Sequence, residues 1–146
     1  KGIDFAAFLY ASVGNKAVRS YERFLTYSNK SRLYLDRWTG EGTSNTTPRA
    51  STNASNNYLF SDFFVEDASF LRIQNVQLGY SIPVSTLEKI KMDKLRVYIA
   101  ANNLYTFTKY NGYNPDVSNA NPAAAGVDLG QYPQTRTFTL GINVSF

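Results

Sequence analysis

The 146-residue sequence lacks both cysteine and histidine. Without cysteine there are no disulfide bridges, thiolate nucleophiles or zinc–thiolate centres, and without histidine there is no Ser-His-Asp catalysis and no imidazole metal ligand. An enzyme domain is therefore the weakest of the functional hypotheses. We expect no catalytic residue, no cofactor and no metal site.

Long apolar runs and dense charge are also missing. No stretch approaches the ~20 apolar residues of a transmembrane helix, although this leaves membrane strands open, because their signal alternates. The 15 basic and 11 acidic side chains are scattered and give a net charge of +4. A nucleic-acid surface needs a denser basic stripe, so we expect no nucleic-acid partner. The small cluster at Lys89, Lys91, Lys94 and Arg96 is interpreted as a solvated turn.

The last twelve residues, 135–146, carry the clearest pattern. One parity is apolar: Phe138, Leu140, Ile142, Val144 and Phe146. The other is small and polar: Thr135, Thr137, Thr139, Gly141, Asn143 and Ser145. Side chains alternate across a strand, whereas a helix would mix the two sets, so the pattern predicts a β-strand with one apolar face.

Three further strands are predicted, within residues 3–13, 61–82 and 94–107. The strand within 61–82 changes parity at Gln74-Asn75, where we predict a β-bulge, because an extra residue restores the facing of the side chains. Pro83 ends this strand, since proline cannot donate a hydrogen bond to a neighbouring strand.

The lengths of the connections distinguish a soluble sheet from a membrane barrel. Residues 14–68 and 108–133 form long polar loops, the first with a helical turn or two within 21–38, and residues 83–93 form a short connection. Compact soluble domains seldom contain structureless loops beyond ~12–15 residues, whereas outer-membrane barrels alternate long extracellular loops with short periplasmic turns. The predicted fold class is therefore all-β: about four antiparallel strands of a large transmembrane β-barrel with long extracellular loops.

Two groups of carboxylates and amides have an ordinary explanation beside a functional one. The first group is Asp62, Glu66 and Asp67. We interpret it as a polar strand entry rather than an acid/base site, because catalysis requires a geometry that spacing alone does not supply. The second group offers oxygen ligands of the kind that calcium takes, but without the spacing of a known calcium loop, so a solvated loop is favoured. This group is Asn114, Asp116, Asn119, Asn121 and Asp128.

Aromatic residues in the loops are the candidate contacts for a ligand or a partner protein, because exposed rings stack on sugars and anchor interfaces. Packing within the loops or a membrane girdle is the ordinary explanation. The candidates are Tyr58, Phe60, Phe63, Phe64, Tyr110, Tyr113 and Tyr132. A second set is expected to face the barrel lumen if the alternate apolar residues face lipid. It consists of Arg96, Tyr98, Asn102 and Asn143.

Several ordered motifs run along nearly the whole chain. They are Arg37-Trp38-Thr39 with Pro48-Arg49-Ala50, SDFFVEDASFLRIQNVQLGYSIP at 61–83, LRVY at 95–98 with NNLYTFTKY at 102–110 and GYNPD at 112–116, and YPQTR at 132–136 continuing to Phe146. These motifs resemble the C-terminal end of the SusC/RagA family of TonB-dependent outer-membrane transporters of Bacteroidota.

The resemblance implies a location and a set of partners. Residues 1–146 are expected to be a C-terminal fragment of a barrel of about 22 strands in the cell outer membrane, with the plug and N-terminal parts absent. A start at Lys1 without a signal peptide agrees with this expectation. The parent protein would import an oligosaccharide or a peptide, with TonB acting through the absent N-terminal part and a SusD-like lipoprotein at the extracellular mouth. Outer-membrane lipid would cover the apolar face, and Phe146 fits the signal that the barrel-assembly machinery reads.

The alternative is a soluble β-sandwich module that binds carbohydrate. It predicts that the face carrying Leu140, Ile142 and Val144 is buried against a second sheet. The barrel predicts that the same face is open and meets lipid.

Overall fold

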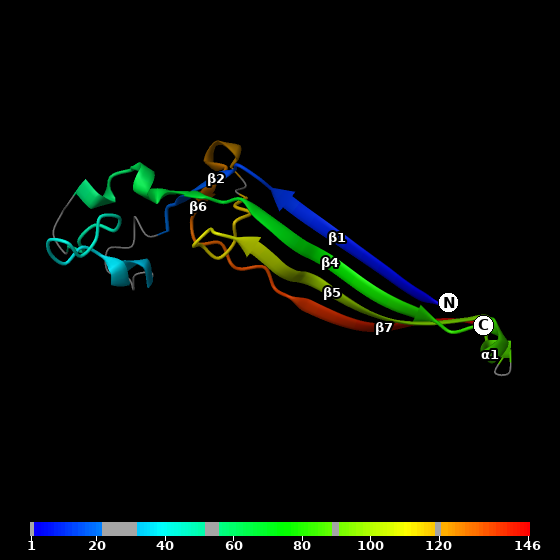
Figure 1. The fold of residues 1–146 in the computed structure, drawn as a ribbon. Coiled ribbons are helices and arrows are strands. Elements are labelled where there is room, and N and C mark those ends of the chain that lie inside the picture. The colour runs from blue at the N-terminus through cyan, green and yellow to red at the C-terminus, as the bar shows by residue number, and fades with distance from the viewer. Residues whose placement is uncertain (1, 22–31, 52–55, 89–90, 119–120) are drawn as a thin grey trace. The chain divides into compact units, whose positions relative to one another are not determined.

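The computed structural model describes residues 2–21, 32–51, 56–88, 91–118 and 121–146 (Figure 1). The strands are β1 (Ile3–Ser12), β2 (Lys16–Arg19), β3 (Val65–Asp67), β4 (Phe70–Ser81), β5 (Lys94–Thr108), β6 (Val127–Asp128) and β7 (Thr137–Ser145). The short helices are the α-helical turn α1 (Val84–Leu87) and the 3-10 turns η1 (Arg32–Asp36), η2 (Asn56–Tyr58), η3 (Asp62–Phe64) and η5 (Pro122–Ala124). Among the described residues, no helix has the length and apolar character needed to span a lipid bilayer.

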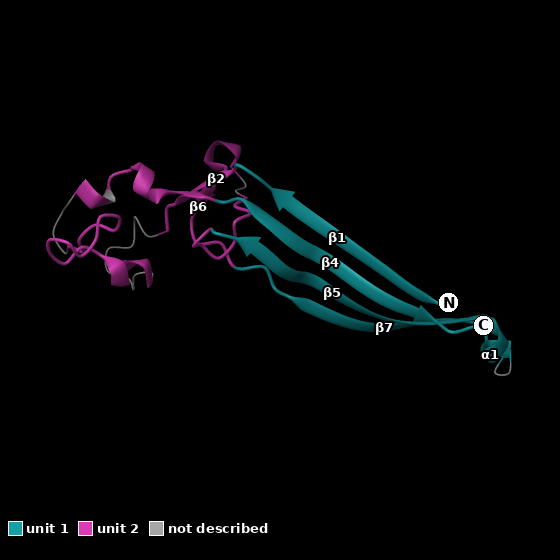
Figure 2. Cartoon of the chain, in the orientation of Figure 1, with its two compact units in different colours: residues 1–14, 68–109, 133–146 teal, residues 15–67, 110–132 magenta. Residues whose placement is uncertain are grey.

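The chain divides into two compact units, each assembled from segments that lie far apart in the sequence (Figure 2). Unit 1 comprises residues 1–14, 68–109 and 133–146, and unit 2 comprises residues 15–67 and 110–132. Unit 1 therefore holds the four predicted strands, and unit 2 holds most of the two predicted long loops.

Unit 1 is a four-stranded antiparallel sheet in the order β1-β4-β5-β7, visible as the long arrows in Figure 1. Each strand pairs with the next long strand along the chain, which confirms the four predicted strands and the all-β fold class. β4 ends at Ser81, two residues before Pro83, in agreement with the predicted end of this strand, and the short connection to β5 contains α1.

A bulge in β4 keeps the two faces of the sheet in register. The ladders on both sides of β4 pass from Ile73 to Asn75 and skip Gln74, which confirms the predicted bulge. On β5 the same level holds Asn103, whose backbone φ is +51°. The inserted residue returns the following side chains to their original face, so the alternation continues along the full strand.

The two faces of this sheet differ in chemistry. The register places these residues on the apolar face: Ile3, Phe5, Leu9, Leu71, Ile73, Val76, Leu78, Tyr80, Leu95, Val97, Ile99, Tyr105, Phe107, Phe138, Leu140, Ile142 and Val144. The polar face carries Asp4, Arg72, Asn75, Gln77, Arg96, Tyr98, Asn102, Thr106, Thr137, Thr139 and Asn143, together with Phe8, Tyr10 and Phe70.

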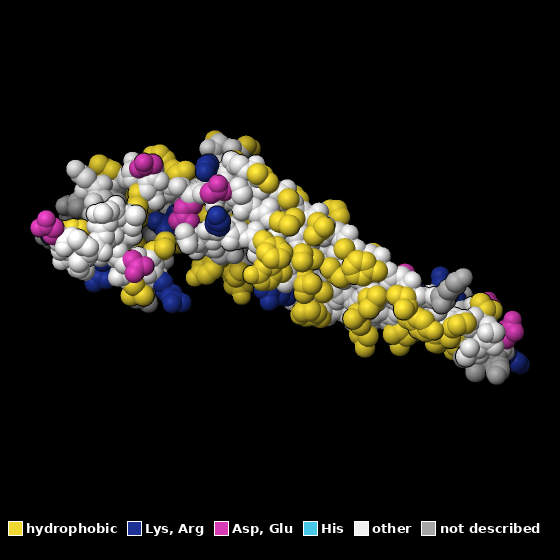
Figure 3. Space-filling model, viewed as in Figure 1, with side chains coloured by type: hydrophobic (Ala, Val, Ile, Leu, Met, Phe, Trp, Pro, Cys, Tyr) yellow, Lys and Arg dark blue, Asp and Glu magenta, His cyan; other side chains and the backbone are white. Residues whose placement is uncertain are grey.

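The apolar face is open to its surroundings. Leu140 is 73% exposed, Ile142 62% and Val144 43%, and Figure 3 shows hydrophobic side chains gathered along the sheet. The β-sandwich alternative required these three side chains to be buried against a second sheet. That prediction is wrong for the part of the chain that the structure describes.

Unit 2 contains a three-stranded sheet that the sequence analysis did not predict. β2 pairs antiparallel with β3 and parallel with β6, so the prediction of long loops without strands is wrong here. These strands are four, three and two residues long, too short to show alternation, and β6 comes from the second long loop. The helical turn predicted within 21–38 is confirmed at η1, while residues 22–31 lie outside the described residues.

We expect Gly141→Ala to lower the free energy of unfolding of the full-length protein by about 1–3 kcal/mol, the usual cost of overpacking. Gly141 lies opposite Tyr98, and a β-carbon at position 141 would overlap the tyrosine ring. Chemical denaturation measures the loss, and Thr139→Ala, on the same face of the same strand, is the matched control. The double variant with Tyr98→Ala should be less destabilised than the sum of the single losses, and simple additivity would contradict this packing.

Candidate functional site

Arg96 is the central charge on the polar face of the sheet. Its Nε and Nη2 donate to the two carboxylate oxygens of Asp4 at 2.9 and 2.5 Å, a bidentate ion pair that joins β5 to β1 across β4. With its amide oxygen turned toward the guanidinium, Gln77 accepts from Arg96 Nη2 at 2.7 Å. The guanidinium also lies 5.2 Å from the ring centroid of Tyr98. Gly79 leaves the space for this network, because a β-carbon there would overlap both Arg96 and Asp4.

The residues predicted to face the lumen share this side of the sheet. Asn102 accepts from the side-chain amide of Asn75 at 2.7 Å, and Asn143 is the register partner of Arg96. Together with Tyr98 they form one polar surface opposite the apolar face. That this surface borders a lumen stays a prediction.

Arg72 is a second polar-face charge, which the sequence analysis did not select. It is 3% exposed, and it donates to Thr106 Oγ1 at 3.0 Å and to Gln134 Oε1 at 2.9 Å. The alternation pattern could have identified Arg72, because a charged residue between Leu71 and Ile73 on an alternating strand lies on the polar face. No local pattern indicates the contact with Gln134, 62 residues further along the chain.

In unit 2, the buried carboxylate of Glu66 forms an ion pair within the first long loop and hydrogen bonds to the second. Arg19 Nη1 lies 2.9 Å from Glu66 Oε1, and the two side chains are 2% and 15% exposed. The other Glu66 oxygen accepts from the backbone N–H and the side-chain amide of Asn111, at 3.1 and 3.0 Å. Asp67 forms an exposed pair with Lys16 at 3.4 Å. These acidic residues therefore hold the strand entry, which agrees with their ordinary explanation.

Asp128 is a second buried anchor of unit 2. Its Oδ2 accepts from the Tyr110 hydroxyl at 2.7 Å, and its Oδ1 accepts from the backbone N–H groups of Gly130 and Gln131 at 2.8 and 3.2 Å. Burial, and then the hydrogen bond to Asp128, raise the pKa of Tyr110 above its ordinary value. The phenol therefore stays protonated and donates.

Among the residues considered as calcium ligands, the side chains of Asn114, Asn121 and Asp128 are engaged in hydrogen bonds within unit 2. Asn114 and Asp116 bond to each other within one turn, and Asn121 accepts from the Ala123 N–H at 3.0 Å. Asn119 lies outside the described residues. Within the described ranges, no three acidic side chains come together in a way that could hold a metal ion.

The loop aromatic candidates separate into buried and exposed residues. Tyr110 is buried and Phe64 packs inside unit 2, so the expectation of exposed contacts is wrong at these two positions. The exposed candidates are Phe60, Tyr113 and Tyr132. The side chain of Tyr58 lies outside the part of the chain that the structure describes. Phe146 follows directly after β7 and is exposed.

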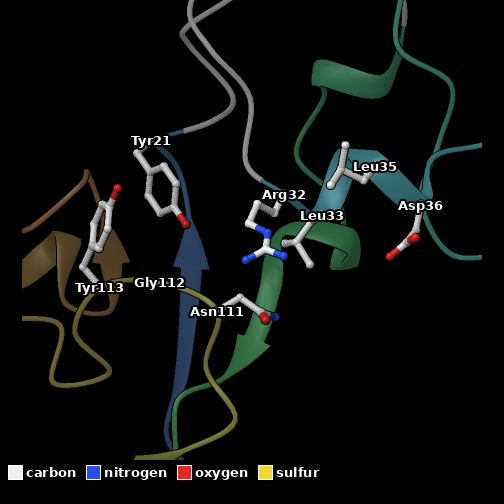
Figure 4. Close-up of a pocket in the computed structure, with 8 residues that line it drawn as sticks. All are labelled: Tyr21, Arg32, Leu33, Leu35, Asp36, Asn111, Gly112 and Tyr113. Atoms are coloured by element: carbon white, nitrogen blue, oxygen red, sulfur yellow. The ribbon is translucent and has the colours of Figure 1, made fainter.

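Tyr113 lines a cavity of about 620 Å³ in unit 2 (Figure 4). Figure 4 shows Tyr21 and Tyr113 on one side, the η1 residues Leu33 and Leu35 on the other, and Arg32 between them. Asp36, Asn111 and Gly112 complete the lining. Its volume lies within the ~300–1,000 Å³ typical of ligand sites, and its mixture of both charges with apolar groups suits an amphipathic ligand.

No family model matches the chain. The TonB-dependent receptor SusC of Bacteroides thetaiotaomicron is 34% identical to it over 153 residues, and TonB-dependent receptor P3 of Formosa agariphila is 30% identical over 154 residues, each match covering 100% of the chain. The solved RagAB peptide transporter superposes on 100% of the chain with a TM-score of 0.77 and 29% identity. The chain belongs to the SusC/RagA family of TonB-dependent receptors.

This SusC/RagA chain spans only a small part of the relatives it matches. It covers 14% of SusC, 15% of receptor P3 and 16% of the RagAB chain. TonB-dependent receptors are outer-membrane β-barrel proteins, and the family inferred from the sequence motifs is confirmed.

We expect Tyr110→Phe to loosen unit 2 and to weaken its response to alkaline pH. Phenylalanine leaves one oxygen of the buried Asp128 carboxylate without its donor, a cost of about 1–3 kcal/mol. Because the folded-state pKa of Tyr110 is raised, the stabilisation is fully present below the ordinary tyrosine pKa of about 10 and is lost as the pH rises above it.

Proteinase K cleavage within residues 110–132 of the full-length receptor measures this effect. At pH 8 the variant should be cut several-fold faster than the parent, and the ratio of the two rates should shrink at pH 11. Tyr132→Phe, at an exposed position, should match the parent at both values. A rate ratio for Tyr110→Phe that does not change between pH 8 and pH 11 would contradict the assignment.

Proposed function

We propose that this chain forms part of the barrel wall and the extracellular loops of an outer-membrane TonB-dependent importer. The observation that carries the proposal is the exposed apolar face of the four-stranded sheet. The largest apolar patch of a soluble monomer is usually about 300–600 Å². A strand in a membrane barrel instead presents an apolar side chain to lipid at every second position. The apolar face of the sheet is therefore suited to contact with lipid.

The connections support an orientation in the membrane. β4 and β5 are joined by the short segment around α1, whereas the other two connections pass through unit 2. Since bacterial barrels have short periplasmic turns and long external loops, we assign α1 to the periplasm and unit 2 to the cell exterior. The polar face with the Arg96–Asp4 pair then borders the lumen.

The two edge strands support membership of a larger barrel. β1 and β7 each have one strand partner in the described sheet, and an unpaired edge inside a bilayer leaves backbone groups without hydrogen bonds. We propose that further strands of the same protein pair with these edges, in a barrel of about 22 strands. The chain would then be the C-terminal part, after the plug and N-terminal parts, with Phe146 as the aromatic that the assembly machinery reads.

The proposed cargo is an oligosaccharide or a peptide too large for porins. TonB supplies the energy through the N-terminal part, and a SusD-like lipoprotein covers the extracellular mouth. Two relatives support this proposal: SusC, and RagAB, which is a peptide importer. We assign the lipoprotein contact to unit 2, where Phe60, Tyr113 and Tyr132 are exposed.

Uptake in cells tests the import proposal. Deletion of the receptor gene should abolish TonB-dependent uptake of at least one member of a set of fluorescent oligosaccharides and oligopeptides, and re-expression should restore it. Affinity purification of the receptor from detergent-solubilised outer membranes should recover a SusD-like lipoprotein. Uptake that survives deletion of either the receptor or TonB would contradict the import mechanism.

A pair of adjacent lysine substitutions tests the membrane placement. Leu140 lies on the apolar face near the middle of β7, and Thr139 lies on the polar face. Lysine facing lipid near the bilayer midplane costs about 2–4 kcal/mol, so Leu140→Lys should reduce the amount of folded receptor in the outer membrane. Thr139→Lys should leave that amount nearly unchanged. Equal levels of the two variants would argue against a lipid-facing position for Leu140.

A further inference from the structure

A second cavity in unit 2, of about 410 Å³, has a lining unlike that of the first. Two aromatic rings, from Trp38 and Phe63, contribute to its wall. Its other lining residues are polar except for Pro48, and Arg49 is the single charged residue among those that the structure describes. The first cavity, by contrast, contains two leucines and both signs of charge.

The Phe63 ring is held in place by two neighbouring side chains. The Arg19 guanidinium lies 5.2 Å from the centroid of the Phe63 ring, and the Phe64 ring meets the Phe63 ring edge-on at 5.1 Å. Arg19 is itself fixed by its buried pair with Glu66. Phe63 is therefore a preorganised ring, and its ordering cost is already met before a ligand arrives.

The loop that carries Trp38 is closed by its own hydrogen bonds. The Trp38 N–H donates to the Thr47 carbonyl at 2.9 Å, and the Thr47 N–H donates to Ser44 Oγ at 3.2 Å. Two further lining residues are joined where the Asn57 side-chain amide donates to the Arg49 carbonyl at 3.1 Å. The part of the polar lining from Ser44 to Thr47 therefore stands on a closed turn.

The polar lining consists of groups that both donate and accept. Asn45, Asn56 and Asn57 supply amides, and four serine or threonine residues supply hydroxyls. Amides and hydroxyls match the hydroxyl groups of a sugar, each of which also donates and accepts. The flat C–H face of a sugar ring packs on an aromatic face, as apolar surface does in general.

Other ligand classes fit this lining less well. No carboxylate lines the cavity among the described residues, so a cationic ligand finds no counter-charge. The described part of the lining also contains no leucine, isoleucine, valine or methionine that would receive the apolar side chains of a peptide. The seven neutral hydrogen-bonding residues outnumber the single arginine, so the lining favours a neutral ligand over an acidic one.

We propose that the cavity between Trp38 and Phe63 is a binding subsite for a neutral saccharide. The inference rests on the proposed importer function, which it deepens by naming one class of cargo. A subsite on an extracellular loop unit would retain the saccharide outside the barrel before import. The two aromatic rings bind its apolar face, and the asparagine amides bind its hydroxyl groups.

A glycan array with neutral and acidic glycans tests the proposal, using full-length receptor purified in detergent. The receptor should retain neutral glycans, and calorimetry with the strongest neutral glycan gives the dissociation constant. Trp38→Ala should weaken binding by about tenfold or more, and Asn45→Ala by about threefold, since a central aromatic contributes more than one rim hydrogen bond. Leu129→Ala, exposed in unit 2 and lining neither cavity, should stay within about twofold of the parent.

Four results would overturn the proposal. They are retention of acidic glycans alone, retention of no glycan, unchanged affinity in both Trp38→Ala and Asn45→Ala, and loss of affinity in Tyr113→Ala with Trp38→Ala unaffected. The last result would assign the glycan to the first cavity. Circular dichroism verifies that Trp38→Ala is folded, and Asn45→Ala provides a second reading with little risk to folding.

Because the assay needs neither TonB nor transport, glycan binding without uptake would count against the importer function, and uptake without binding at this cavity would count against the subsite alone.

Discussion

The alternation of side chains across the four-stranded sheet is the constraint on which the rest of the chain depends. A register slip of one residue would move a whole row of leucine, isoleucine and valine side chains to the polar face. The bulge at Gln74 and the irregularity at Asn103 preserve the alternation along β4 and β5. The same register brings Arg96 to Asp4 across the intervening strand. One backbone arrangement therefore produces both a surface suited to lipid and a polar surface with its charges paired.

In the sheet, the alternation of side chains determines the structure. In the two long loops, buried charged residues hold the structure together. Glu66 joins Arg19 of the first long loop to Asn111 of the second, and the β2–β6 pairing joins the same two loops through their backbones. Loops joined in this way are folded before any ligand or partner arrives, which lowers the entropy lost on binding. This preorganisation distinguishes unit 2 from a set of independent flexible loops and gives physical support to a binding role for its cavities.

The sheet was predictable from the sequence because its information is local and repeated. Alternation over nine or more residues indicates each long strand, and a single change of parity locates the bulge at Gln74-Asn75. Unit 2 was not predictable in the same way, since its strands are two to four residues long and its anchors join distant residues. Tyr110 illustrates the limit: an aromatic beside an Asn-Gly turn suggests exposure, and only the fold reveals the bond to Asp128, 18 residues away. For the same reason the cavity lined by Trp38 and Phe63 required the structure, although both rings were visible in the sequence.

A spin-label scan of β7 would show directly whether lipid covers one face of this sheet. The chain has no cysteine of its own, so single cysteines introduced at positions 137–140 and 142–144 of the full-length receptor can be labelled once any cysteines elsewhere are replaced. In lipid vesicles, collision with oxygen reports lipid contact, and collision with a water-soluble nickel chelate reports water. If lipid covers the apolar face, oxygen maxima should occur at Phe138, Leu140, Ile142 and Val144, with minima at the positions between them. Uniform access of the nickel chelate along the strand, or oxygen maxima on the other parity, would contradict contact of this face with lipid.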